Sequence, residues 1–142
     1  MTVRAINTPP DKYKPICDIF VHTIEDMLPD SIDELKLSAV VNFDYCEPYD
    51  PDRLYESLKL QTYISVTGVI RNSEGDPWEI AKRRFGYTTR IESAFLDSPD
   101  YVEDSNHSMK RDLANIILNI IKFSKTGEIV KDDATGGLVN II

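Results

Sequence analysis

The chain has 142 residues, of which 42% are hydrophobic and 28% are charged, and its formal net charge at pH 7 is −8. A chain of this length fits one domain and buries roughly two thirds of its unfolded surface. We therefore expect residues 1–142 to form a single domain that needs no covalent or metal cross-links for stability. The composition excludes wholesale disorder. The acidic balance argues against a protein that coats nucleic acid unspecifically, because like charge repels phosphate at long range.

The two cysteines, Cys17 and Cys46, are too few for a disulfide scaffold and show no CxxC spacing. The chain also has no apolar run of signal-peptide length and none near the ~20 residues that span a bilayer. We therefore expect a cytoplasmic protein with reduced thiols and no membrane partner.

The first predicted element is an amphipathic helix over residues 16–28. Residues 1–10 are expected to form a flexible N-terminal arm. Pro15 removes a backbone donor, so we expect either a short first turn that is broken near Lys14 or a helix that begins at Pro15. Apolar side chains then recur at helical spacing until Pro29 ends the run. Between Leu35 and Tyr45 apolar residues occupy nearly every second position, which predicts a strand.

The most informative feature is a long predicted hairpin with arms at residues 58–71 and 78–91. Apolar and polar residues alternate along the first arm, which is typical of a half-buried strand. A turn at residues 72–77 gives the following cross-strand pairs on one apolar face: Ile64 with Phe85, Thr62 with Tyr87, and Leu58 with Ile91. The other face collects these candidate partner-binding residues: Lys59, Tyr63, Arg71, Lys82, Arg84 and Arg90.

A cationic sheet face is unusual on an acidic chain, and it suggests contact with an acidic partner or with phosphate. The alternative interpretation is a solvated face whose charges suppress aggregation through the sheet edge. Both interpretations remain open at this point.

A second helix is expected after an acidic loop at residues 97–104, and Gly127 follows its last turn. At ~1.5 Å per residue this helix covers about 28 Å, whereas each hairpin arm reaches about 45 Å at ~3.3 Å per residue. The hairpin therefore either bends, at Gly68 or Gly86, or has its tip covered by the first helix or by another subunit. The tail at 128–142 ends in an apolar segment that is expected to add a strand to this sheet or to that of a second subunit. The candidate oligomer contacts are Ile70, Trp78, Ile80, Leu138, Val139 and Ile141.

The expected fold is α+β, in the order α-β-β-β-α with a further strand in the tail. Three long strands form an antiparallel sheet, and both helices cover its apolar face.

No catalytic, metal or cofactor motif is recognisable. His22 and His107 lack companions at a ligand spacing, the cysteines fall at apolar or strand-end positions, and no glycine-rich phosphate loop or GxSxG is present. The acidic loop at 44–52 lacks the glycine and distal glutamate of a calcium loop. We therefore expect no catalytic residues, no metal and no cofactor.

The sequence favours a non-catalytic protein-binding or assembly module that self-associates and engages a protein partner through its sheet, as a small chaperone, an inhibitor or a component of a larger particle does. Three alternatives remain open. They are local nucleic-acid binding through the basic face, an acidic inhibitor that mimics nucleic acid, and a hydrolase or metal enzyme at His22 or His107.

Overall fold

The computed structural model describes residues 3–47, 56–71, 74, 77–126 and 138–139, with only the backbone described at 78–82, 126 and 138–139. The fold is α+β. Its elements in chain order are β1 (Val3–Ile6), a 3₁₀ turn (Asp11–Tyr13), α1 (Lys14–Met27), β2 (Ser31–Ile32), β3 (Leu35–Cys46), β4 (Ser57–Arg71), β5 (Pro77–Glu92), a 3₁₀ turn (Ser93–Phe95), α2 (Pro99–Thr126) and β6 (Leu138–Val139).

The strands form one mixed sheet in the order β1-β3-β4-β5-β6, and β2 pairs with the start of β3. The three long strands β3, β4 and β5 are mutually antiparallel, as expected. The expected element order and the flexible arm were wrong at the N-terminus, because Val3–Ile6 is a strand that runs parallel to β3. A parallel neighbour requires a long crossover connection, and α1 supplies it. Four residues are too few to show the alternation by which a strand is recognised.

The predicted hairpin register is confirmed. Ile64 lies opposite Phe85, Thr62 opposite Tyr87 and Leu58 opposite Ile91. The register shifts by one residue between Val66 and Gly68, where β5 contains an extra residue. Gly68 has φ +140°, a conformation that side chains rarely adopt, so one of the two predicted glycine positions does mark an irregularity in the hairpin.

Helix α1 begins at Lys14 with Pro15 in its first turn, close to the predicted start. Helix α2 starts at Pro99, so residues 100–104, expected in an acidic loop, are its first turns. Proline at the first helical position and carboxylates near the positive end of the helix dipole both favour this earlier start. At ~1.5 Å per residue α2 is about 42 Å long, against about 53 Å for β5 at ~3.3 Å per residue, so the hairpin exceeds its helix by less than predicted.

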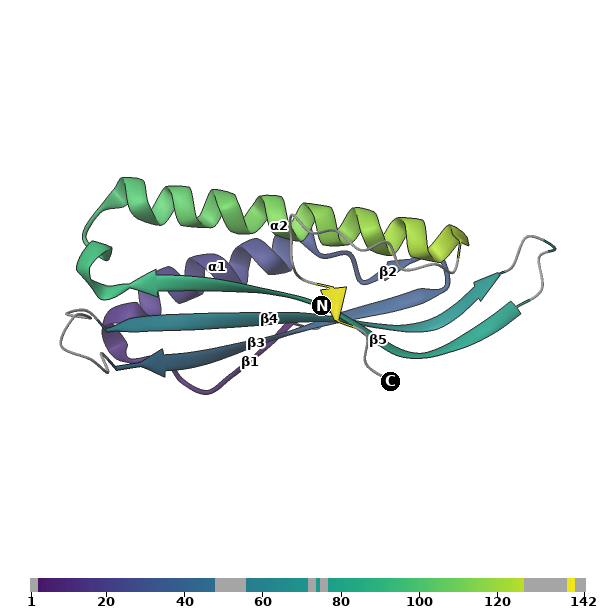
Figure 1. Cartoon of the computed structure of the whole chain (residues 1–142), viewed down its shortest axis with the longest axis horizontal. Coiled ribbons are helices and arrows are strands. Elements are labelled where there is room, and N and C mark those ends of the chain that lie inside the picture. The colour runs from purple at the N-terminus through teal and green to yellow at the C-terminus, as the bar shows by residue number, and fades with distance from the viewer. Residues whose placement is uncertain (1–2, 48–55, 72–73, 75–76, 127–137, 140–142) are drawn as a thin grey trace.

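Both helices pack on the same face of the sheet (Figure 1). The core between them contains side chains from every long element, among them Phe20, Ile64, Phe85 and Leu113, all at most 1% exposed. Burying each such side chain contributes about 1.5–3 kcal/mol. The opposite face of the sheet carries no described helix, so among the described elements only strands form that side (Figure 1).

Part of the tail joins this sheet. Leu138 and Val139 form β6, which pairs antiparallel with Phe85 and Arg84 of β5. The tail strand expected from the apolar C-terminus is therefore present at these two residues and belongs to the chain's own sheet. The rest of the tail, including Ile141, lies outside the described residues.

Candidate binding face of the sheet

The side of the sheet away from the helices, here called the open face, carries most of the predicted partner-binding residues. The pairing register places every second residue of β3, β4 and β5 on it, and β1 adds Arg4 and Ile6. Its described cations are Arg4, Lys36, Lys59, Arg71, Arg84 and Arg90. Lys82 lies in the bulge of β5, where the register with β4 shifts between Val66 and Gly68. Its side chain is outside the described part of the structure.

Two of these cations make an ion pair or hydrogen bond to another described residue. The Arg71 guanidinium lies 3.0 Å from a Glu34 carboxylate oxygen, and Arg90 donates a hydrogen bond to the Ser57 hydroxyl at 3.1 Å. Lys59 lies between Asp44 on β3 and Arg90 on β5 in the strand register. These positions belong to the two ends of the hairpin, and among them the charge of Arg71 is compensated by Glu34.

Tyr63 and Arg84 form the centre of the open face. Tyr63 lies opposite Gly86, where an added Cβ would approach the ring Cδ1 to 2.9 Å, so the absence of a side chain at Gly86 lets the ring lie across β5. The Arg84 guanidinium lies 5.4 Å from the centroid of that ring, in cation–π range. The ring position therefore depends on a glycine that sequence reasoning considered only as a bend.

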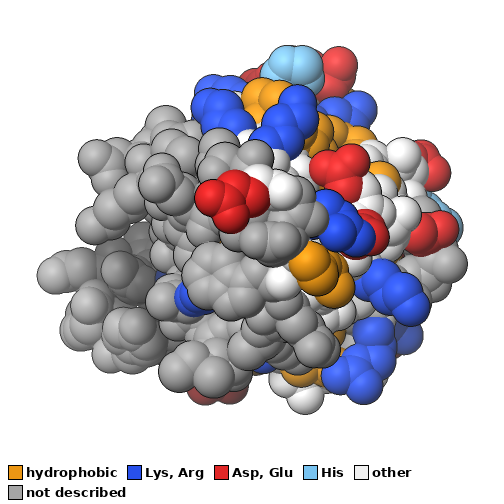
Figure 2. Space-filling model, turned by 90° about the vertical axis from the view of Figure 1, so that its right-hand side faces the viewer, with side chains coloured by type: hydrophobic (Ala, Val, Ile, Leu, Met, Phe, Trp, Pro, Cys, Tyr) orange, Lys and Arg blue, Asp and Glu red, His pale blue; other side chains and the backbone are white. Residues whose placement is uncertain are grey.

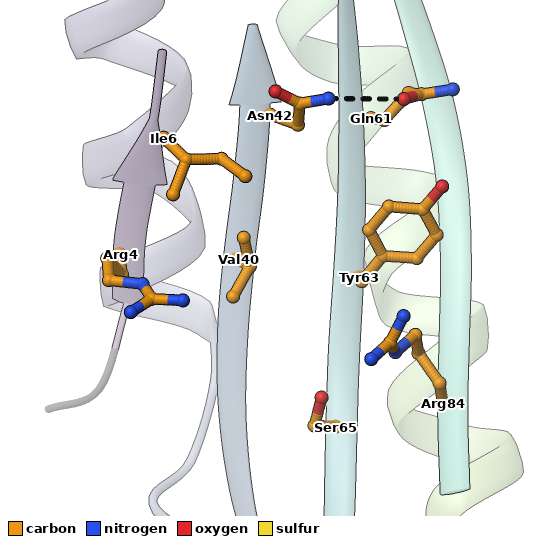
Figure 3. A pocket seen from close by; sticks show the side chains of 8 residues that line it. All are labelled: Arg4, Ile6, Val40, Asn42, Gln61, Tyr63, Ser65 and Arg84. Carbon is orange, nitrogen blue, oxygen red and sulfur yellow. Dashed lines mark hydrogen bonds between the residues drawn. The ribbon is translucent and has the colours of Figure 1, made fainter. Parts of the chain in front are cut away.

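A hollow of about 330 Å³ lies beside this pair, over the middle of the sheet. Its walls are the longer side chains of Arg4, Ile6, Gln61, Tyr63 and Arg84, and its floor consists of the smaller side chains of Val40, Asn42 and Ser65. Figure 3 looks onto this face with the helices behind the strands, and it shows Arg4 and Arg84 directed inwards from opposite sides. The hollow lies over small residues of β3 and β4, between Arg4 and Ile6 of β1 on one side and the longer side chains of β4 and β5 on the other.

Amide side chains line one end of the hollow. The Asn7 side chain donates to the side-chain oxygen Oδ1 of Asn42 at 2.6 Å. The Asn42 side chain in turn donates to Oε1 of Gln61 at 3.5 Å (Figure 3). This row connects the loop after β1 to β3 and β4. It also restricts the rotamers of Asn42 and Gln61, so that end of the hollow is held in place before any ligand arrives.

The distribution of charge distinguishes the two sides of the molecule. Figure 2, seen along the long axis from the hairpin end, shows basic side chains grouped at the lower right, on the sheet side. At the top, on the helix side, basic and acidic side chains lie next to one another. The register places six described cations on the open face, on a chain whose formal net charge is −8.

The residues predicted as oligomer contacts do not form one described patch. Ile70 is only 3% exposed in the single chain, so its burial requires no second subunit. Trp78 and Ile80 pair with Ile70 and Gly68 on the backbone, but their side chains are not described.

The histidines and cysteines are dispersed. His22 is exposed and lies 3.5 Å from a Glu25 oxygen, and His107 is exposed on α2. Burial raises the pKa of Cys17 to about 12, whereas Cys46 is half-buried. Within the described residues no three potential ligands group into a metal site, and no described helix is long and apolar enough to cross a membrane.

Sequence reasoning missed Arg4, Ile6, Val40, Asn42, Gln61 and Ser65 as lining residues of the hollow. The alternation in β3 and β4 placed four of these on the polar side of their strands, which was a usable signal. No such sequence signal existed for Arg4 and Ile6, because β1 was not predicted. The acidic segments suggested as a nucleic-acid mimic are mainly the first turns of α2 and residues outside the described ranges.

Comparisons of this chain with protein-family models, with curated proteins and with solved structures find no match.

Proposed function

We propose that this protein is a non-catalytic binding or assembly module that engages a protein partner through the open face of its sheet. The observation that carries the proposal is the asymmetry of the sheet. Both helices cover one face, while the other presents a preformed hollow surrounded by cations on an otherwise acidic chain. A concave site with a few convergent polar groups is the usual form of a binding surface.

The size of the open face fits a protein interface. At ~4.8 Å per strand and ~3.3 Å per residue, the shared stretch of β3, β4 and β5 is about 14 Å wide and about 33 Å long, and with the four residues of β1 the region covers about 500 Å² in plane. Specific interfaces bury about 800 Å² on each partner once side-chain relief is included. One partner seated on the strands would therefore cover most of this face.

Self-association is part of the proposal. The hairpin of β4 and β5 continues past the end of α2 (Figure 1), so its far end lies beyond the helix layer of its own chain. A second subunit is the occupant we propose for that end, because symmetric homo-oligomers are the commonest assemblies of soluble chains. Native mass spectrometry of the full chain tests this, and a monomer at micromolar concentration would contradict it.

Site-specific photo-crosslinking in cells tests partner binding through the sheet. A photoreactive residue at Thr88, which is exposed on the open face, should yield a discrete crosslinked product. The matched position Asp104, which is exposed on α2, should not. Crosslinking at Asp104 but not at Thr88 would refute the assignment of the sheet as the binding surface.

Local nucleic-acid binding is the second candidate, and one observation favours it. The Tyr63 ring is seen face-on in Figure 3, so one ring face is turned outwards, next to Arg84. Aromatic and arginine side chains on a sheet are typical of single-strand binding. Binding of oligothymidylate should then weaken steeply with salt, and replacing both Arg4 and Arg84 by glutamine should reduce the slope of log affinity against log salt.

A further inference from the structure

The hollow on the open face contains two guanidinium groups whose hydrogen-bonding capacity is largely unused. Arg84 has no hydrogen bond or ion pair to any described residue, and its Nε is buried without a partner. Arg4, exposed on β1, likewise has no ion pair within the described ranges. Guanidinium groups bind planar oxyanions in a bidentate fashion, and such charge-assisted bonds are roughly twice as strong as neutral ones.

The other lining residues restrict the class of ligand that fits the hollow. Ile6, Val40 and the Tyr63 ring supply apolar surface between the two arginines, and Asn42 and Gln61 supply amide groups at one end. A volume of about 330 Å³ corresponds to about ten waters at ~30 Å³ each, which is room for one or two side chains. Such a lining suits a polypeptide segment that carries both acidic and apolar side chains.

We propose that this hollow anchors an extended acidic segment of the partner protein, with Arg4 and Arg84 binding its carboxylates. This inference rests on the proposed function, because it specifies the chemistry that the open face recognises. Adjacent strands lie ~4.8 Å apart, so the backbones at Arg4 and Arg84 are separated by about 14 Å across β1, β3, β4 and β5 and by about 7 Å along them, or about 16 Å in all. In an extended peptide, side chains on one face repeat every ~6.7 Å, so acids at alternate positions reach both arginines when the segment crosses the strands.

Charge also favours an acidic peptide over nucleic acid. Duplex DNA carries one phosphate charge per ~1.7 Å of axis, and such a polyanion is repelled at long range by a chain of net charge −8. A segment with a few carboxylates meets only the local positive field of the open face. The repulsion between the two whole molecules is correspondingly smaller.

A nuclear magnetic resonance titration of the full-length, ¹⁵N-labelled protein tests the inference. The probe is a short peptide of alternating glutamate and threonine, and the same peptide with glutamine in place of glutamate is its uncharged control. The glutamate peptide should shift the amide signals of Val40, Tyr63 and Arg84, and the glutamine peptide should not. Arg4→Gln and Arg84→Gln should each lower the affinity by about 3- to 10-fold, the range expected for a partly exposed charge-assisted pair.

Lys36→Gln is the matched control, because Lys36 is an exposed cation of the same face that does not line the hollow. It removes the same charge and should change the affinity less than about twofold, since exposed charges a Debye length apart are largely screened. Arg4 is exposed on an edge strand, so Arg4→Gln provides the test even where Arg84→Gln impairs folding.

The inference would be overturned by no shifts in the hollow, by equal shifts with the glutamine peptide, or by an equal loss of affinity in Lys36→Gln. Oligothymidylate that binds the same residues more tightly than the peptide would overturn it in favour of nucleic acid. Its failure is distinguishable from that of the proposed function. If Thr88 crosslinks to a partner but the arginine variants have no effect on affinity, only the binding of an acidic segment in the hollow is refuted. If Thr88 gives no crosslink, the proposal of protein binding through this face is refuted.

Discussion

Gly68 of β4 packs closely against the turn between β2 and β3, and we expect its replacement to lower the free energy of unfolding. Gly68 has φ +140°, and a Cβ at this residue would lie 2.3 Å from the Glu34 carbonyl oxygen and 3.0 Å from the Leu35 Cα. Carbon and oxygen atoms in favourable contact are ~3.3 Å apart or more, so the Glu34 carbonyl would have to move by about 1 Å. That carbonyl accepts the Val69 amide hydrogen bond at 3.4 Å, which would be lost.

The expected cost of Gly68→Ala follows from these two terms. Holding a non-glycine residue in such a conformation costs about 1–3 kcal/mol, and the lost hydrogen bond adds about 1 kcal/mol. The free energy of unfolding should therefore fall by about 2–4 kcal/mol, a large part of the 5–15 kcal/mol typical of a domain. For a chain of this size the melting temperature should fall by about 10 °C.

Urea denaturation followed by far-ultraviolet circular dichroism measures this loss. The midpoint should decrease while the slope of the free energy against urea stays constant, which indicates an unchanged denatured state. Gly86→Ala is the control, because the nearest atom to its added Cβ is Tyr63 Cδ1, on a side chain that can rotate. It should cost less than about 1 kcal/mol. A Gly68→Ala protein as stable as the parent, or a Gly86→Ala protein destabilised to the same extent, would refute the reasoning.

The remaining predictions concern Tyr87 and the two thiols. Tyr87→Phe should raise the free energy of unfolding by about 1 kcal/mol in the same denaturation assay, because the buried Tyr87 hydroxyl makes no hydrogen bond of good geometry to a described residue, although Thr62 lies opposite it; a loss of stability would mean that the hydroxyl is bonded, with Thr62 as the nearest candidate. Burial raises the pKa of Cys17 from about 9 to about 12, so the native state retains a proton that the unfolded chain loses, and stability should fall as pH rises from about 9 to about 12, by up to about 1.4 kcal/mol per pH unit. The stability difference between the parent and Cys17→Ala should narrow over that pH range, and a constant difference would contradict the shift. In native protein at neutral pH a thiol reagent should modify Cys46 first and Cys17 only on unfolding, and mass spectrometry of the modified peptides identifies the order; equal rates would contradict the burial of Cys17.

The local patterns in the sequence determined the long elements and their faces. Alternation along residues 58–71 and 78–91 was sufficient for the hairpin register, because a shift by one residue would turn Ile64 and Phe85 away from the core. The same constraint placed Lys59, Arg84 and Arg90 together on the polar side. Helical periodicity also identified both helices, although dipole and proline effects extended α2 back to Pro99.

Only the tertiary structure decided which strands lie beside β3 and what the polar face contains. β1 is too short to carry a pattern of its own, and its parallel position next to β3 depends on the path of α1 across the sheet. That placement brings Arg4 and Ile6 to the opposite wall of the hollow from Arg84, about eighty positions away in the chain. Gly86 likewise gained its role from Tyr63 on the neighbouring strand. Alternation assigns a residue to a face, but contacts between strands distant in sequence determine which side chains on that face meet.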